Sequence, residues 1–372
     1  MFCYISCIKR TLLLRFSNFA HCFDDLPDQL KKKTTIYDIA NALNITVSTV
    51  SRALSGFPAI SDTTRKAVVD MAKKLNYSPN KLASALKSGK TYIIGVIVPS
   101  VEAHFFASII HCIEDGLKDS GYRVIIYQSN EIVENEINGV KTLLEAQVDG
   151  IMASLSLETK DVSHFTEIIE QNKPLILFDR VNTGLNVPTI TLDDFKAGYM
   201  ATKHLIDKGY KKIAFVTTAH QVKIFTDRLE GYKAALADQK LPVITDHIIL
   251  GGLSIKDGHF GAGELMRNHK PDAIIAGDDF TALGLIQKLK EIGATPPEIG
   301  VIGFANEAFS AYITPSLSTI DQHASQMGKE CANMFLKMIG QKNPYSKIEH
   351  VILNPSIIER ESTDPSTTLR AT

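Results

Sequence analysis

The run 47–52 carries side-chain types that read DNA bases, at the spacing of one short helix. It reads Val-Ser-Thr-Val-Ser-Arg, and the residues on its exposed face are Val47, Ser48, Thr49, Ser51 and Arg52. Arginine bonds guanine through two donors, a serine hydroxyl donates or accepts, and valine contacts a thymine methyl group. Because the first residues of a recognition helix reach the base edges, the pattern predicts a DNA-reading helix rather than a merely solvated polar face.

Three short helices are predicted to position this run. Thr35 caps a first helix with apolar residues at 36, 39, 40 and 43, and Thr46 caps the second, which turns Val50, Ala53 and Leu54 inward. A third helix extends from 61 or 62 to 75, with residues 67, 68, 71, 72 and 75 on its inner face. Two short helices joined by a tight turn form a helix-turn-helix.

The charge distribution supports the same interpretation. The whole chain has a formal net charge of -1, which on its own argues against a nucleic-acid binder. Residues 31–90, however, carry eleven Lys or Arg and three Asp or Glu, a net charge of +8, while 91–372 carries -9. A small basic module joined to a large acidic body favours a polyanionic partner for the module alone.

Enzyme chemistry finds little support in the sequence. Ser84 and Lys87 have the Ser-x-x-Lys spacing of a nucleophile motif, but the companion Ser-Asp-Asn and Lys-Thr-Gly motifs are missing. The glycines at 258, 261 and 263 lack dinucleotide or phosphate-loop spacing. His104 and His111 would lie about 10.5 Å apart along a helix, too far to share a metal ion. We therefore expect no catalytic residue, no metal and no cofactor.

The two ends add little chemistry. Residues 1–30 contain three of the five cysteines and an apolar stretch broken by Lys9, Arg10 and Arg15, which does not form a signal peptide. We interpret 1–30 either as a poorly packed tail or as the product of a start site placed too far upstream. No apolar run reaches the roughly 20 residues that a membrane-spanning helix needs, so we expect a cytoplasmic protein with no membrane partner.

Residues 77–86 predict a short hinge helix, with Leu82 and Leu86 on one face and Pro79 in its first turn. Together with 35–40 and 47–54, this segment resembles the head-piece of the LacI/GalR family of repressors, in order and in spacing. The resemblance implies that the residues matching Val47, Ser48 and Arg52 read the major groove, and that Leu86 inserts into the minor groove and kinks the operator. We also expect Thr35, Thr49, Ser51 and Leu82 to be DNA-binding residues. Ser84 departs from the basic residue that is frequent in the family before the wedge.

From Thr91 onward, apolar strands alternate with helices. The predicted strands lie at 93–98, 123–127, 150–153, 175–178, 213–217, 247–250, 273–276 and 299–304. The predicted helices lie at 105–119, 135–146, 162–171, 195–208, 226–238, 256–269, 280–291 and 324–339. This alternation predicts an α/β body of two lobes with doubly wound parallel sheets, with a ligand between the carboxyl ends of the strands.

This body resembles the two-lobed, periplasmic-binding-protein-like core that the same family carries, up to the strand around 352–360. The resemblance implies an effector in the cleft, most often a sugar, held by Phe105, Phe106, Asp179, Arg228 and Asp278. The family usually presents an aspartate after the strand Ile-Gly-Phe, where this chain has Ala305. Either Asn306 takes that role or the ligand lacks the corresponding hydroxyl group.

The domain boundaries that we predict are a tail at 1–30, a helix-turn-helix domain at 31–77, a hinge and linker at 78–90, an effector and dimerisation core at 91–362, and a tail at 363–372. The function we expect is that of a homodimeric repressor that binds a quasi-palindromic operator and responds to a small ligand. The alternative is an exported sugar-binding protein for transport, which would leave residues 34–86 without a role.

Overall fold

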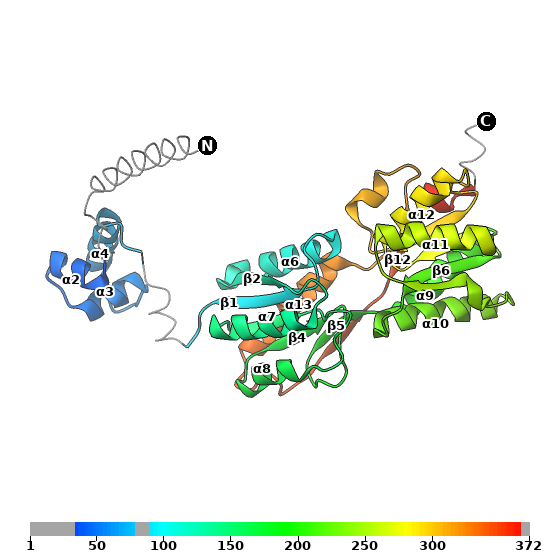
Figure 1. The fold of residues 1–372 in the computed structure, drawn as a ribbon. Helices are drawn as coiled ribbons and strands as arrows, with labels where there is room; N and C mark the ends of the chain where they lie inside the picture. The colour runs from blue at the N-terminus through cyan, green and yellow to red at the C-terminus, as the bar shows by residue number, and fades with distance from the viewer. Residues whose placement is uncertain (1–33, 79–88, 366–372) are drawn as a thin grey trace, which may run out of the picture. The chain divides into compact units, whose positions relative to one another are not determined.

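The computed structural model describes residues 34–78 and 89–365, which fall into two compact units that divide between Gly89 and Lys90 (Figure 1). We call the described part of the first unit the head and that of the second unit the core. In the part of the chain that the structure describes, no helix is both long and apolar enough to cross a membrane.

The head contains the three predicted helices, α2 (Ile36–Leu43), α3 (Val47–Leu54) and α4 (Asp62–Lys74). Thr46 and Ser61 cap α3 and α4 through their hydroxyl oxygens, which accept the N–H groups of Thr49 and Thr64. The turn after α2 is possible because Asn44 takes a left-handed conformation with φ 52°, which asparagine tolerates better than most residues.

A small apolar cluster holds these helices together. Its buried members are Ile39, Ala40, Val50, Ala53, Val68 and Ala72. Ala67 is exposed, which contradicts its predicted place on the inner face, because α4 turns Val68 and Ala72 inward instead. Since so few side chains are buried, the fold of the head depends on each of them.

The first lobe of the core is built on a six-stranded parallel sheet with the order β11-β5-β4-β3-β1-β2. Its strands are β1 (Ile93–Val98), β2 (Arg123–Gln128), β3 (Gly150–Ala153), β4 (Leu175–Phe178), β5 (Thr189–Leu192) and β11 (His350–Leu353). Its helices are α6 (His104–Leu117), α7 (Val133–Glu145), α8 (Thr166–Glu170) and α13 (Ala324–Ile339).

The second lobe has a six-stranded sheet with the order β12-β10-β9-β8-β6-β7, in which only β12 runs antiparallel. Its strands are β6 (Ile213–Thr218), β7 (Ile248–Gly251), β8 (Ala273–Ala276), β9 (Gly300–Phe304), β10 (Ser318–Asp321) and β12 (Ser356–Ile358). Its helices are α9 (Asp194–Asp207), α10 (Lys223–Asp238), α11 (Ile255–Asn268) and α12 (Asp279–Glu291).

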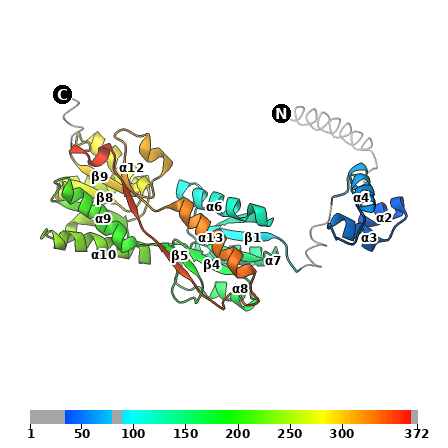
Figure 2. The same ribbon diagram turned by 180° about the vertical axis from the view of Figure 1, so that it is seen from behind.

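The chain crosses between the lobes three times, after β5, after β10 and between β11 and β12, and the last crossing is visible from behind in Figure 2. The predicted α/β architecture of two doubly wound lobes is confirmed. The strands β5 and β10 were not predicted, and the single strand expected around 352–360 is two strands, β11 and β12, in different lobes.

The glycines of α11 serve helix packing. A Cβ atom on Gly258 would lie 1.9 Å from the carbonyl oxygen of Thr281, and one on Gly284 of α12 would lie 2.0 Å from that of Ile255. Because glycine has no Cβ, α11 and α12 can pack backbone against backbone. This close packing accounts for Gly258 without any nucleotide.

The structure also shows where the core begins and how far it extends. The carboxylate of Asp149 accepts the backbone N–H groups of Thr91 and Tyr92, both at 2.9 Å, and so anchors the chain just before β1. At the other end Thr363 is fully buried, and its hydroxyl group bonds His204 and Ser318. Thr363 therefore belongs to the core and not to the predicted tail.

Candidate functional site

The exposed face of α3 is the first candidate site. Ser48 and Arg52 are exposed, and Thr49 and Ser51 are half-buried. Val47, predicted on the open face, is half-buried and packs in part against the apolar cluster of the head. Because Val50 and Ala53 are buried, the orientation of α3 is fixed and this polar face is turned to solvent.

Hydroxyl groups cluster at the first turn of α3. Thr46 Oγ1 lies 2.9 Å from Ser48 Oγ and 2.8 Å from Thr49 Oγ1. One turn further on, the guanidinium carbon of Arg52 lies 5.5 Å from the ring centroid of Phe57. This contact of cation and ring limits the conformations of Arg52, so the face presents short hydrogen-bonding groups beside one oriented arginine.

Thr35 has a different local role. Its N–H and hydroxyl groups both donate to Asp38 Oδ2, at 2.7 and 2.8 Å, in a capping box at the start of α2. The residue is exposed, and its predicted role in DNA binding stays a prediction. The predicted hinge helix, with Leu82 and Leu86, lies outside the described residues.

The second candidate site is a cavity of about 730 Å³ between the two lobes of the core. Both lobes line it, through the ends of their strands and the first turns of the following helices. Five of the six predicted effector residues are among its lining: Phe105, Phe106, Asp179, Arg228 and Asp278. The cavity lies where parallel sheets of this topology bind ligands, beyond the carboxyl ends of their strands.

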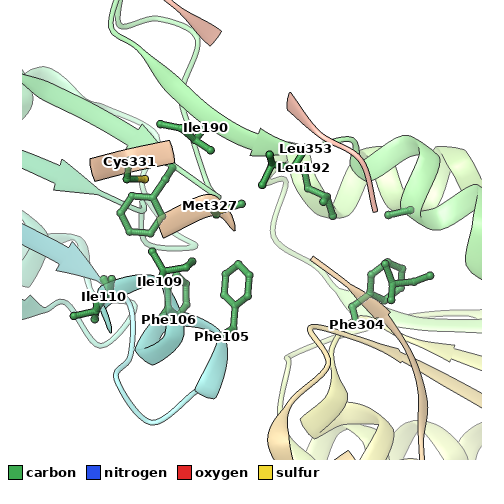
Figure 3. Packing of buried hydrophobic residues seen from close by; sticks show 14 of the residues in the cluster. Phe105, Phe106, Ile109, Ile110, Ile190, Leu192, Phe304, Met327, Cys331 and Leu353 are labelled. Atoms are coloured by element: carbon green, nitrogen blue, oxygen red, sulfur yellow. The ribbon is translucent and has the colours of Figure 1, made fainter. Parts of the chain in front are cut away.

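Aromatic rings form one wall of the cavity. Phe105 and Phe106 open α6 with their ring centroids 5.2 Å apart, edge to face. Figure 3 shows Phe105 projecting from α6 on the side of the second lobe, where Phe304 lies at the end of β9. Phe225 on α10 and Phe280 on α12 add rings from the second lobe. Aromatic faces are the usual apolar surface for a sugar ring or a planar base.

Arg228 is the most constrained polar side chain of the cavity. It is 2% exposed, its Nε donates to Asp194 Oδ1 at 2.8 Å, and one terminal nitrogen donates to the Gly277 carbonyl oxygen at 3.1 Å. Its guanidinium carbon lies 4.4 Å from the ring centroid of Phe304. The other terminal nitrogen is buried and has no hydrogen-bond partner among the described residues. A buried donor without a partner is costly, unless a ligand uses it.

Asp179 faces Arg228 from the first lobe. It has φ 57°, a left-handed conformation, and accepts a hydrogen bond from Ser154 Oγ at 3.3 Å. Burial raises the pKa of Asp179 above its usual range, against the opposing charges of Arg180 and Arg228. Residues held in such backbone conformations cluster at binding sites, where the surrounding structure offsets the strain.

Arg180 and Glu131 complete this side of the cavity. One terminal nitrogen of Arg180 donates to both carboxylate oxygens of Glu131 at 2.8 Å, and Glu131 also accepts the N–H of Leu157 at 2.9 Å. Arg180 Nε is buried without a hydrogen-bond partner in the described chain, 3.9 Å from Asp179 Oδ2. The pair thus brings two charged side chains of the first lobe to the cavity.

Asp278 and Asp279 open α12 and have distinct environments. Asp278 is the N-cap residue, and its Oδ1 accepts the N–H of Thr281 at 2.7 Å. Asp279 is fully buried and accepts from Ser310 Oγ, Thr319 Oγ1 and the Glu307 N–H at 2.7, 2.7 and 2.8 Å. Burial raises the pKa of Asp278, and it raises the pKa of Asp279 to about 7.

Asn306 does not line the cavity. Its side-chain oxygen accepts a hydrogen bond from Arg360 at 2.8 Å, and its amide nitrogen lies 3.4 Å from Asp321 Oδ2, so the amide is engaged elsewhere. Its neighbours Ala305 and Glu307 line the cavity, as does Gln322 from the segment after β10. The structure therefore does not bring Asn306 to the place that was predicted for it.

Several cavity residues were missed in the sequence. Arg180 directly follows the predicted Asp179, so the strand end itself was the available signal. Glu131 and Phe225 lie in segments with no distinctive local pattern, and Glu307 follows two residues of positive φ, a feature that a sequence does not display. These residues meet only through the fold of the two lobes.

Metal chemistry has no support within residues 34–78 and 89–365, where no group of three or more His, Cys, Asp or Glu side chains is placed to hold an ion. The two described cysteines, Cys112 and Cys331, are free, and burial raises the pKa of the Cys331 thiol well above its usual range. Cys331 packs in an apolar cluster that contains residues of both lobes (Figure 3).

Comparison with known families gives two matches that together span both units. The model for bacterial regulatory proteins of the lacI family matches residues 35–80. The model for periplasmic binding proteins and the sugar binding domain of the LacI family matches residues 91–358. A transport protein would not account for the first match.

This chain aligns with nearly the whole length of characterised relatives. Catabolite control protein A of Priestia megaterium is 32% identical over 317 residues, which are 84% of this chain and 95% of that protein. The ribose operon repressor of Haemophilus influenzae is 31% identical over 332 residues, 88% of this chain and 98% of that protein. These relatives are transcriptional regulators rather than enzymes.

Solved structures share the fold. The Lac repressor dimer bound to operator and an anti-inducer aligns with a TM-score of 0.79 and 23% identity, over 89% of this chain and 99% of that chain. A LacI family regulator from Enterococcus faecium with bound ribose aligns with a TM-score of 0.66 and 29% identity, over 73% of this chain and 99% of that chain.

Proposed function

Because the chain belongs to the LacI family of bacterial regulatory proteins, we propose that a small uncharged sugar, bound between the lobes of the core, controls its binding to an operator. The chain is a DNA-binding transcriptional regulator by family. We further propose which residues read DNA, what kind of ligand the core binds, and that the protein is a homodimer.

The polar face of α3 supports major-groove reading. Arg52 is exposed and lies against Phe57, which leaves its donors free to meet guanine acceptors, and the Ser48 hydroxyl lies one turn earlier. Contacts of this kind specify sequence, whereas lysines that meet phosphates only position the protein.

A mobility-shift titration tests this assignment. Arg52→Ala should cost about 1–3 kcal/mol at one base pair and relax specificity there. Lys66→Ala, which removes the same charge from an exposed position of α4, should weaken matched and mismatched sites alike. If Arg52→Ala weakened both kinds of site equally, direct readout by Arg52 would be wrong.

The unpartnered terminal nitrogen of Arg228 is the observation that carries the ligand proposal. Arg228 lines a cavity of about 730 Å³, so an acceptor on a bound ligand would satisfy this buried donor. Asp179 and Asp278 stand nearby as acceptors, so the cavity offers both donors and acceptors to hydroxyl groups, next to the rings of Phe105 and Phe106.

The charges of the lining favour an uncharged ligand. Six carboxylates, from Glu102, Glu131, Asp179, Asp278, Asp279 and Glu307, line the cavity with three cations, from Arg180, Arg228 and Lys256. Burial raises the pKa of Asp179, Asp278 and Asp279, but even with these three protonated the other three carboxylates balance the three cations, so the lining offers no excess positive charge to an anionic ligand such as a sugar phosphate. Where any of the three is ionised, the site repels such a ligand. A neutral polyhydroxylated ligand meets no such repulsion.

A thermal-shift screen tests the ligand proposal, because a ligand that binds only the folded core raises its melting temperature. Neutral pentoses, hexoses and disaccharides would be compared with their phosphates, and a shift by a neutral sugar is expected. Asp278→Asn should then weaken binding about tenfold while keeping the helix cap, since asparagine caps as well as aspartate does. Glu298→Gln, at an exposed site of the same lobe, is the matched control.

Two edge strands support the homodimer. Ile125 and Ile126 of β2 are 39% and 47% exposed, and Leu250 of β7 is 55% exposed. Exposed apolar residues on unpaired sheet edges are typical of surfaces that a partner covers. We expect Ile126→Lys to shift sedimentation from dimer toward monomer, while Ile292→Lys, at another exposed isoleucine, leaves it unchanged.

A further inference from the structure

One hydrogen-bonded contact joins the two lobes across the cavity. Glu307, which follows β9 in the second lobe, accepts the backbone N–H of His104 at 2.9 Å and that of Phe105 at 3.2 Å. Both N–H groups belong to the first turn of α6 in the first lobe. Glu307 is 4% exposed, so the contact is shielded from water.

The contact takes the place of a local helix cap. The N-cap residue of α6 is Ala103, which has no side-chain oxygen, so the helix cannot satisfy its first N–H groups from its own sequence. A carboxylate at this end also meets the positive end of the helix dipole. The cap of α6 therefore depends on how the two lobes are placed relative to each other.

The second lobe holds Glu307 firmly. Its own N–H donates to Asp279 Oδ2 at 2.8 Å, and Asp279 is in turn fixed by Ser310 and Thr319. The two residues before it, Ala305 and Asn306, have φ 109° and 54°, which turns the chain toward the cavity after β9. The carboxylate thus reaches α6 from a rigid support.

We propose that Glu307 is a positioning residue, an interlobe clasp that holds the core in the arrangement seen here by capping α6 across the cavity. The clasp is made wholly of groups of this chain, so it biases the lobes whatever ligand the cavity takes. Its meaning for regulation rests on the proposed function, because a ligand that needs this arrangement binds in proportion to the fraction of molecules that adopt it.

A helix-compatible variant removes the donor side of the clasp. His104 is the first residue of α6, where proline is well tolerated, and Ala103 before it already has the extended backbone that proline requires, φ −73° and ψ 127°. His104→Pro deletes one of the two N–H groups. His104→Ala keeps the N–H and removes only the side chain, which lies near Ser108, and is the matched control.

Single-molecule fluorescence transfer between the lobes tests the proposal on the full chain, with no sugar or DNA added. Azide-bearing residues replace the exposed Lys141 on α7 and Gln287 on α12, and labelled subunits are mixed with excess unlabelled protein. We expect one dominant transfer efficiency for the starting protein and for His104→Ala. Glu307→Gln and His104→Pro should each raise the minor populations about tenfold, the scale of a lost hydrogen bond to a charged group.

The double variant decides between a clasp and two unrelated effects. Glu307→Gln combined with His104→Pro should change the distribution little more than Glu307→Gln alone, because both act on one interaction. Identical distributions in all variants, or effects that simply add, would overturn the proposal. If Glu307→Gln does not fold, His104→Pro alone still gives the test. The transfer measurement uses no sugar, so a failed sugar screen would not change its outcome. A failed clasp test would likewise not change the outcome of the sugar screen.

Discussion

The head and the core present their functional groups in opposite ways. In the head, the candidate major-groove residues lie within one helix, exposed or half-buried, above a cluster of only six buried residues. In the core, the candidate ligand residues come from both lobes, and Arg228 and Asp179 are 2% and 6% exposed. An exposed polar face can bind a large polyanion such as DNA. Buried polar groups, in contrast, can orient a small ligand that fits between them.

The head and the core also differ in which residues adopt left-handed backbone conformations. The left-handed positions of the head are occupied by Asn44, Gly56, Asn76 and Gly89, residue types that tolerate positive φ. The cavity of the core places Glu131, Asp179 and Ala305 in positive-φ conformations, with φ 61°, 57° and 109°. The core also has such residues outside the cavity, for example Gln147 and Lys240, so the ligand site is one of several places where the core accepts backbone strain. Among the described residues of the head, only asparagine and glycine have positive φ.

The largest effect is expected from breaking the buried charge pair of the cavity. Arg228→Met leaves the Asp194 carboxylate 5% exposed and without its cation, which should destabilise the core by about 3–5 kcal/mol. Urea unfolding measures this loss in the free energy of unfolding of the core. Adding Asp194→Asn should restore much of the loss, because the unpaired charge is gone. A double variant as unstable as the single one would show that packing, not charge, dominates.

The next effect separates the two units. Ile39→Ala opens a cavity in the cluster of the head, where Ile39 is fully buried, and should cost about 2–5 kcal/mol. Since the head is small, we expect DNA binding to be lost while the melting transition of the core stays in place in calorimetry. Asn41→Ala, at an exposed site of the same helix, should do neither. A shift of the core transition by Ile39→Ala would contradict independent folding of the units.

The same contrast explains what the sequence could predict. The three helices of the head and the caps Thr35 and Thr46 are local patterns, and the structure confirms them. Most strands and helices of the core followed from apolar periodicity. The strands β5 and β10 were missed because their sequences, Thr-Ile-Thr-Leu and Ser-Thr-Ile-Asp, are partly polar. The equally short strands β4 and β8, which were predicted, are continuous apolar runs.

The cavity was predictable only in part. Asp179 and Asp278 end buried strands or cap helices, so their place at the carboxyl edge follows from the alternation of strands and helices. Glu131 and Glu307 come from loops far away in the sequence, and only the packing of the lobes brings them together. Asn306 was one of two alternatives, and its side chain does not reach the cavity lining because it bonds Arg360, a partner 54 residues away.

A pH effect should be confined to the core. Burial raises the pKa of Asp279 from near 4 in the unfolded chain to about 7 in the fold. The folded state thus binds this proton more tightly, and the stabilisation is complete below pH 4 and is lost as the pH rises through 7. Each tenfold gain in proton affinity on folding contributes ~1.4 kcal/mol.

Comparison with Asp279→Asn separates the pH dependence due to this carboxyl group from that due to histidines, which titrate in the same pH range. The melting temperature of the starting core should exceed that of Asp279→Asn by most at pH 5, and the difference should shrink toward pH 8. A difference that is constant from pH 5 to pH 8 would mean that Asp279 stays ionised in the folded core, held by its three donors.

The smallest effect probes the strain of the cavity. Ala305 has φ 109°, a conformation that glycine adopts at little cost, so Ala305→Gly should stabilise the core by ~0.5–1 kcal/mol once the greater freedom of the unfolded glycine is subtracted. Ala294→Gly, a half-buried alanine of the same lobe outside the positive-φ set, should instead destabilise the core by a similar amount. Chemical denaturation of both variants gives the sign of each change in the free energy of unfolding. Equal losses would place Ala305 in an unstrained backbone, and the contrast between head and core would then rest on Glu131 and Asp179 alone.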